Sequence, residues 1–423
     1  MTTATPSSTP STIAVLGAGG RGSSIGTAIN GLPHLARVVA VADPDAGKVA
    51  QLGDACGVAA GGRFASWQDF LASGMQVDGV VIATMDQDHV EPAIACLQRG
   101  WHVILEKPMA PNLEDCQRIE AAQRASGRCM TVCHSLRYQK AFRTVRDLVA
   151  GGAVGRIMTI DLIEQVSWWH QAHSFVRGNW GNSGRSAPMI LAKSCHDLDY
   201  LAFLTGAPAL RLMSYGHLSY FTRANAPTGA PKRCSDGCPH ESTCAYSALK
   251  AYVYGERNHW PASVCSPTDH SLEAHLAAVR TGPYGRCVWQ CDNDVVDHQV
   301  IALEFPGEIT ATFTMTAFTQ EGGRRLRVHG THGVLEFNDH AQEITVTTFA
   351  TGNVQRISVA RESGGHGGGD TRMVRDWLEA LRSGDSAGLV STAQESLRTH
   401  AMAFAAERSR RERRPVELAE PGV

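Results

Sequence analysis

The sequence lacks several features that would place it in a specialised class of protein. No apolar run approaches the roughly 18 residues that a membrane-spanning helix needs. Lys and Arg total 39 against 41 Asp and Glu, so the net charge of −2 gives no strong positive field for nucleic acid. The opening MTTATPSSTPST has neither the basic nor the apolar segment of a secretion signal. We therefore expect a polar tail over residues 1–11, a cytoplasmic protein, and no nucleic-acid or membrane partner.

Cysteine is not dense enough for a disulfide scaffold, with twelve in 423 residues. In the cytoplasm such cysteines are free thiols or metal ligands rather than disulfides. Half of them fall in a long segment of about residues 222–294, which we interpret as an insertion. Four soft ligands close a tetrahedral structural zinc site, and an iron–sulfur cluster or packed free thiols are the alternatives. The zinc hypothesis uses Cys234, Cys238, Cys244 and Cys265.

The first third of the chain alternates short apolar runs with helical segments. This order predicts strands with crossover helices in a doubly wound parallel sheet, a Rossmann domain over residues 12–133. The expected strands are residues 12–17, 37–42, 78–84, 101–106 and 129–133, and the clearest expected helix is 112–126.

A glycine-rich motif follows the first expected strand. Gly17, Gly19, Gly20, Arg21 and Gly22 fit the pattern G-x-G-x-x-G at the start of a helix, where backbone N–H groups can hold a pyrophosphate.

An acid follows the second expected strand at the spacing typical of dinucleotide-binding domains. Asp43 can accept hydrogen bonds from a ribose hydroxyl, and with Asp45 it would repel a 2′-phosphate. The pattern therefore favours NAD over NADP.

Glu106-Lys107-Pro108 lies just past the carboxyl end of another expected strand, where ligands bind in such sheets. With GAGGRG, VVAVADPD and WHVILEKPMAPNLEDC, this triplet resembles the Gfo/Idh/MocA oxidoreductases, the glucose-fructose oxidoreductase and inositol dehydrogenase family. The resemblance implies a catalytic or substrate-orienting role for Lys107. It also implies that Thr84, His89 and Glu106 contact the nicotinamide half of the cofactor.

Residues 134–423 change in pattern and predict a second α/β domain. Successive strands over residues 296–360 predict a large, open and mainly antiparallel sheet, and helices follow over about 370–410. The resemblance implies that this sheet makes a homodimer or homotetramer.

The segment before residue 200 holds the candidates for proton transfer. His196 is the residue type that titrates near neutrality, and the resemblance implies that it is the active-site histidine. Inositol-dehydrogenase-like members carry an aspartate four residues earlier, where this chain has Ala192. Lys193 could replace that acid as a donor, or act as a base if burial lowers its pKa.

Further polar and aromatic side chains suit a polyol, because rings cover C–H faces while charged and amide groups bind hydroxyls. The alternative is that the tryptophans are core or subunit contacts. The substrate-binding candidates are Arg137, Tyr138, Arg177, Asn179, Trp180 and Asp197.

The leading hypothesis is an NAD-dependent oxidoreductase that moves hydride between nicotinamide and a carbinol carbon of a sugar, cyclitol or sugar derivative. Two alternatives remain at this point. One is a glycoside hydrolase or lyase that retains and recycles NAD, and the other is a non-catalytic sensor of NAD or sugar.

Overall fold

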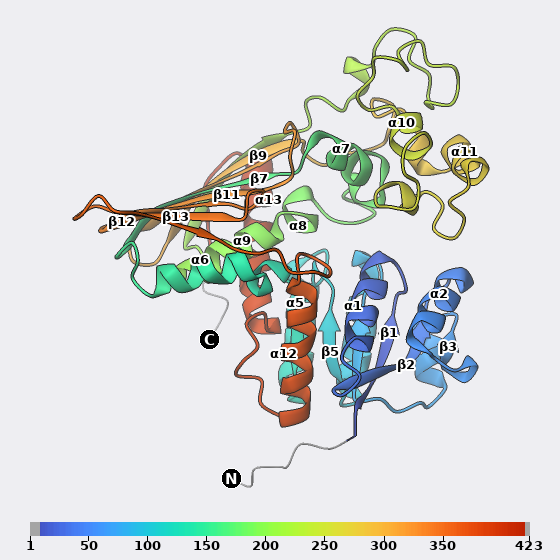
Figure 1. Cartoon of the computed structure of the whole chain (residues 1–423), viewed down its shortest axis with the longest axis horizontal. Coiled ribbons are helices and arrows are strands. Elements are labelled where there is room, and N and C mark those ends of the chain that lie inside the picture. The colour runs from blue at the N-terminus through green and yellow to red at the C-terminus, as the bar shows by residue number, and fades with distance from the viewer. Residues whose placement is uncertain (1–8, 419–423) are drawn as a thin grey trace.

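The computed structural model describes residues 9–418. Two sheets dominate it, with a helical insertion to one side (Figure 1). Residues 1–8 of the expected tail lie outside the described residues, and the first strand already begins at Ser11.

The first sheet is parallel, as the sequence predicts, and has six strands, the short β3 being an addition to the five expected. Its order is β3 (Arg63–Phe64), β2 (Ala36–Ala42), β1 (Ser11–Leu16), β4 (Gly79–Ile82), β5 (His102–Leu105) and β6 (Met130–Val132). The helices that follow these strands are α1 (Gly20–Asn30), α2 (Ala46–Cys56), α3 (Trp67–Ala72), α4 (Val90–Gln98) and α5 (Leu113–Ser126).

Both faces of this sheet are buried, which explains why its strands read as continuous apolar runs. In β1, Ile13 and Val15 pack under α1 and α2, whereas Ala14 and Leu16 pack against the helices of the other face. Side-chain hydrogen bonds to backbone N–H groups fix where some of the helices begin. Asn112 caps α5 by accepting the N–H of Asp115 at 2.9 Å.

The second sheet has nine strands and is antiparallel except where β7 and β10 run parallel. Its order is β14 (Val354–Ser358), β13 (Glu343–Thr348), β12 (Gly333–Asn338), β11 (Gly323–Gly330), β7 (Ile157–Gln165), β10 (Ile309–Thr316), β9 (His298–Phe305), β8 (Arg211–His217) and β15 (Val416–Glu417). This confirms the predicted open, mainly antiparallel sheet. The strands β8, β14 and β15 are additions that the sequence pattern did not reveal.

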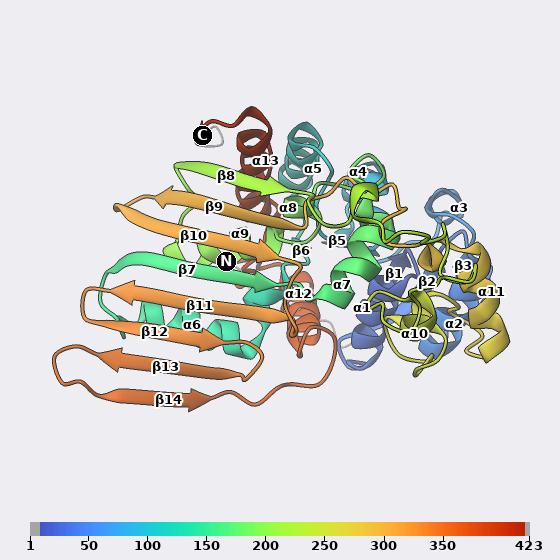
Figure 2. The same ribbon diagram turned by 90° about the horizontal axis from the view of Figure 1, so that it is seen from above.

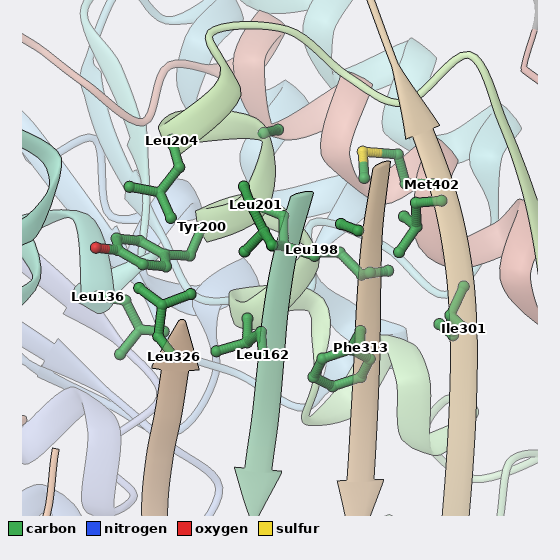
Figure 3. Close-up of a cluster of buried hydrophobic side chains, with 14 of the residues drawn as sticks. Leu136, Leu162, Leu198, Tyr200, Leu201, Leu204, Ile301, Phe313, Leu326 and Met402 are labelled. Atoms are coloured by element: carbon green, nitrogen blue, oxygen red, sulfur yellow. The ribbon is translucent and has the colours of Figure 1, made fainter. Parts of the chain in front are cut away.

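Helices cover one face of this sheet (Figure 1). They are α6 (Lys140–Ala150), α8 (Met189–Ala192), α9 (Cys195–Thr205) and part of α13 (Ala393–Glu412). Figure 3 shows leucines of α9, such as Leu198 and Leu201, lying against Leu162 of β7 and Phe313 of β10. The other face leaves large apolar side chains exposed, including Ile163, Tyr215 and Val300.

The C-terminal helices pack across the boundary between the two domains. Trp377 of α12 (Gly369–Ser383) is fully buried in the core of the first sheet and occupies the space beside Gly79. Helix α13 packs against both sheets, with Leu397 in the first core and Met402 in the second. The two domains are therefore held together by the end of the chain.

The cysteine-containing insertion holds α10 (Ala248–Tyr252) and α11 (Leu272–Thr281). Figures 1 and 2 place it over the β2–β3 edge of the first domain. Thr268 Cγ2 lies 3.6 Å from the position that a Cβ on Gly47 would take, so the insertion touches the start of α2.

Candidate functional site

A side chain of the first domain reaches the second at the carboxyl edge of the parallel sheet. Lys107 follows β5, and its Nζ donates a hydrogen bond to the carbonyl oxygen of Ala192 at 2.6 Å. Ala192 ends α8 and is followed by Lys193, and His196 lies in the first turn of α9. The geometry therefore brings together the three residues that the sequence analysis chose as catalytic.

The glycine-rich turn between β1 and α1 is constrained at two positions and open at two others. A Cβ on Gly22 would lie 1.8 Å from the carbonyl oxygen of Gly17, and Gly17 itself has a φ of +93°. Nothing lies within 4 Å of a Cβ on Gly19 or Gly20. No side chain among the described residues caps the N-terminus of α1, so its N–H groups remain available to an anion.

Asp43 lies at the end of β2, directly beside this turn. Its Oδ2 accepts the N–H of Ala18 at 2.8 Å, and its Oδ1 accepts the N–H of Asp45 at 2.9 Å. These bonds fix a buried carboxylate next to the glycine-rich turn, the place where a ribose hydroxyl would need it.

Arg21 is engaged by protein carboxylates. Its Nε lies 2.7 Å from Glu106 Oε1, and its Nη1 lies 2.6 Å from Asp370 Oδ2. Burial opposes ionisation of Glu106, but the charges of Arg21 and Lys107 outweigh it and lower the pKa of this carboxyl. Arg21 therefore ties α1 to β5 and to α12.

His89 and Thr84 hold the turn that carries Lys107. His89 is fully buried, and its Nδ1 donates to the carbonyl oxygen of Pro108 at 2.7 Å. Its Nε2 lies 3.3 Å from the carbonyl oxygen of Thr84. His89 thus fixes the backbone just beyond Lys107.

His196 lies in a group of four histidines drawn from distant parts of the chain. Its ring centroid is 5.8 Å from that of His134 and 6.3 Å from that of His366, and His134 lies 5.5 Å from His400. Burial and then the charge of Lys107 hold the pKa of His196 well below its usual range. The ring is therefore neutral near pH 7, and its buried Nδ1 has no protein partner among the described residues.

Lys193 belongs to a buried group of four ionisable side chains, in which burial raises the pKa of Asp197 well above its usual range despite the charge of Arg324. Its Nζ lies 3.2 Å from Glu164 Oε1 on β7, and Arg324 on β11 contacts Glu164 as well. Arg324 Nε also donates to Asp197 Oδ1 at 2.9 Å. Burial lowers the pKa of Lys193 against the opposing charge of Glu164, so a carboxylate does neighbour the catalytic segment, supplied from another strand.

Two of the expected substrate-binding residues are used inside the protein. The guanidinium of Arg137 donates to both oxygens of Asp199, at 2.7 and 2.9 Å. The hydroxyl of Tyr138 lies 2.9 Å from Ser391 Oγ, and its ring is fully buried. Tyr138 also lies 3.2 Å from Thr131 Oγ1 of β6, so it links the first sheet to the second domain. As substrate contacts, both residues stay predictions.

The other four candidates have different surroundings. Arg177 donates to the carbonyl oxygens of Arg286 and Tyr246 in the insertion. Asn179 lines a depression on the same side, and Trp180 packs against the core of the second sheet. Asp197 is fully buried and pairs with Arg324.

Trp260 of the insertion, which the sequence analysis did not single out, packs on Trp169 and His170 near Lys193. The ring of Trp260, which is 49% exposed, lies 5.2 Å from Trp169 and 5.0 Å from His170. Burial lowers the pKa of His170 well below its usual range, and the charges of Lys193 and Glu164 also affect it because the ring lies near them. Trp260 comes from the insertion, so the insertion contributes to the surroundings of the site.

The structure regroups the cysteines of the proposed zinc set. Cys234, Cys238 and Cys244 line one cavity, and Cys287 lines it in place of Cys265. Cys265 packs with the aromatic cluster of Tyr252 and Tyr284. Within residues 9–418, no three His, Cys, Asp or Glu side chains are placed as ligands of one metal ion. Over the same range, no helix is both long and apolar enough to cross a membrane.

Comparison with known proteins agrees with this architecture. The model of the oxidoreductase family NAD-binding Rossmann fold matches residues 11–134, and that of the oxidoreductase family C-terminal alpha/beta domain matches residues 146–418. The oxidoreductase YteT of Bacillus subtilis (strain 168) is 28% identical over 312 residues, 71% of each chain. Inositol 2-dehydrogenase 2 of Saccharopolyspora erythraea is 30% identical over 46% of this chain and 53% of its own.

Solved structures share the whole fold. An oxidoreductase domain protein from Kribbella flavida superposes with a TM-score of 0.73 at 18% identity, covering 98% of this chain and 100% of its own. Levoglucosan dehydrogenase in complex with NADH superposes with a TM-score of 0.72 at 16% identity, covering 97% of this chain and 100% of its own. With both domains matched in order, the chain belongs to the Gfo/Idh/MocA family and is an oxidoreductase with an NAD-binding Rossmann domain.

Proposed function

We propose that the protein is an NAD-dependent dehydrogenase that oxidises a CH–OH group of a sugar, cyclitol or sugar derivative, or reduces the corresponding ketone. The observation that carries the proposal is the 2.6 Å contact between Lys107 Nζ and Ala192 O. It brings the lysine after β5 against the segment that holds Lys193 and His196, at the edge of a sheet where nucleotides bind.

The cofactor supplies the hydride acceptor when it is bound, and the chain supplies positioning and proton transfer. Lys107 has three N–H donors, of which Ala192 takes one, so the others can hold the substrate oxygen. His196 is neutral, so its ring can accept the hydroxyl proton. Lys193, held by Glu164, would orient a second hydroxyl.

The glycine-rich turn and Asp43 support NAD rather than NADP as the cofactor. The open space at Gly19 and Gly20 leaves room for a pyrophosphate against α1. The buried carboxylate of Asp43 would accept from ribose hydroxyls and repel a 2′-phosphate.

A sugar or polyol suits the surroundings of Lys193. Trp169, His170 and Trp260 offer ring faces for C–H surfaces, while Lys107 and Lys193 offer donors to hydroxyls. Relatives named inositol 2-dehydrogenase and 1,5-anhydro-D-fructose reductase point to the same class of substrate.

The open face of the second sheet is the surface that we propose for self-association as a homodimer or homotetramer. Its exposed Ile163, Tyr215 and Val300 lie on β7, β8 and β9. Burying such side chains against a second copy would be favourable.

The test is a panel of cyclitols, aldoses, anhydrosugars and sugar acids, incubated with the full chain and NAD⁺ and followed by NADH absorbance. We expect at least one class to reduce NAD⁺, with NADP⁺ a poorer acceptor. Failure of the whole panel in both directions, by a protein shown to bind NAD⁺, would overturn the proposal in favour of a binding role.

A further inference from the structure

The insertion encloses a cavity whose lining includes four thiols. Cys234, Cys238, Cys244 and Cys287 surround it, together with His240. Cys287 is separated from the other three by about forty residues of sequence, so only the fold brings the four together.

Backbone hydrogen bonds hold these cysteines in two pairs. Arg233 and Arg286 form an isolated antiparallel bridge. On either side of it, the N–H of Cys234 donates to Gly285 O at 3.0 Å and the N–H of Cys287 donates to Lys232 O at 2.9 Å.

The second pair lies on consecutive turns. The N–H of Glu241 donates to Cys238 O at 3.2 Å, and the N–H of Cys244 donates to His240 O at 2.8 Å. Two thiols from a bridged pair of segments and two from a tight loop therefore line the same space.

A buried cation lies beside the thiols. The Nη2 of Arg177 donates to Cys234 Sγ at 3.7 Å, and the residue is only 2% exposed. A guanidinium at this place offsets part of the negative charge that several thiolates would carry. It also gives a role to Arg177, whose remaining hydrogen bonds fasten the insertion to the second domain.

The insertion has little other means of holding its shape. Its two α-helices are five and ten residues long, and its apolar residues form two small clusters instead of one core. Metal ligation stabilises small segments of this kind, because the binding free energy is available only to the folded form.

We propose that Cys234, Cys238, Cys244 and Cys287 hold a tetrathiolate metal centre that fixes the insertion over the nucleotide-binding domain. Four thiolates leave no open coordination position, so the centre is structural and takes no part in hydride transfer. No three of these thiols are placed to ligate one ion. A zinc ion therefore requires the side chains to turn inward, whereas an iron–sulfur cluster spans more widely separated thiols.

The centre would act on the site through the position of Trp260. That ring contacts Trp169 and His170 of the second domain, and the nearby His173 stacks on Tyr284 of the insertion at 4.7 Å. A loosened insertion would move Trp260 while leaving Lys107 and His196 in place.

The first experiment measures zinc, iron and acid-labile sulfide in the full chain, purified without chelator and without air. We expect either about one zinc per chain without sulfide, or iron and sulfide in equal amounts. Cys238→Ser should lose the metal, while the control Cys265→Ser, in the same insertion, should keep it. Retention of the metal by Cys238→Ser, or its loss from Cys265→Ser alone, would overturn the assignment.

A second measurement uses the unsubstituted chain, because Cys238→Ser could misfold. A mercurial thiol reagent is titrated into the native protein while released metal is followed by a chromogenic chelator. We expect metal release in proportion to the thiols modified. A native chain that contains no metal, and whose cavity thiols all react freely, would overturn the proposal whatever the outcome of the substrate panel.

Discussion

The two sides of the candidate site are built in different ways. On the nucleotide-binding side, backbone groups nearby in sequence hold two of the groups that shape the site: the N–H of Ala18 holds Asp43, and the carbonyl oxygen of Pro108 holds His89. Arg21 on this side pairs with the distant Asp370 as well. On the second-domain side, Glu164 holds Lys193 through an ion pair. Glu164 also pairs with Arg324, 160 residues further along the chain, and Arg324 in turn binds Asp197. The first side depends on turns, and the second on buried charge.

This difference determines what disturbs each side. A turn changes its conformation when an added side chain does not fit the backbone. A buried charged group instead loses stability when one member is removed and its partners are left unpaired. The predictions that follow separate these two kinds of failure.

The largest expected effect on stability comes from Arg324. Arg324→Met would leave Glu164 and Asp197 buried without their shared cation, and we expect unfolding to become easier by about 3–5 kcal/mol. The control is Arg327→Met on the same strand, whose partner Glu336 is half exposed, with an expected change below about 1 kcal/mol. Denaturant unfolding measures both. Equal losses in the two variants would remove the distinction between the two sides of the site.

Gly22 tests the nucleotide-binding side. A Cβ there would lie 1.8 Å from Gly17 O, so Gly22→Ala must displace the turn that faces the pyrophosphate. Losing one charge-assisted hydrogen bond to a phosphate would weaken NAD⁺ binding about ten- to a hundredfold.

The matched control for this turn is Gly61→Ala, where nothing lies within 4 Å of the added Cβ. Calorimetric titration of NAD⁺ should find its affinity unchanged. If Gly22→Ala also binds NAD⁺ normally, the turn does not hold the cofactor.

The smallest expected effect is the pH dependence of folding stability that the buried His400 causes. Burial and then the charge of His134 lower the pKa of His400 to about 3, against an ordinary value near 6.5. The unfolded chain therefore binds more protons between these values, and folding stability falls as the pH drops below about 6.5.

His400→Gln should remove this contribution, which amounts to about 1.4 kcal/mol at one pH unit below the ordinary value. Glutamine also retains an acceptor for the N–H of Met109. Thermal unfolding from pH 7 to 5 should show a shallower decline in the variant. An unchanged slope would mean that His400 is protonated in the folded protein.

The parts of the fold that the sequence predicted are those in which local signals decide the structure. Asn112 begins α5, and the glycine-rich turn follows β1 as expected. The apolar period also revealed most strands of both sheets. The packing of α12 on the first domain could not be read in this way, because Trp377 indicates a buried helix face without indicating which core buries it.

The same limit applied to the site. Lys107 and His196 lie in sequence motifs that can be recognised. Glu164 and Arg324 lie on strands without such a motif, and only the fold shows that they pair beside Lys193. His366 lies in the glycine-rich stretch GGHGGG and reaches Asp370 and Arg21. His134 could have been found, because it follows β6 at the same sheet edge as Lys107 follows β5.

The central claim is that Lys107 performs the chemistry at a site that holds NAD independently of it. The direct test is to measure turnover and NAD⁺ affinity on the same preparations of the unsubstituted chain, Lys107→Met and the exposed control Lys140→Met. We predict that kcat/KM falls about 10²–10⁴-fold in Lys107→Met alone, with NAD⁺ affinity retained in all three. Full turnover by Lys107→Met would contradict the account.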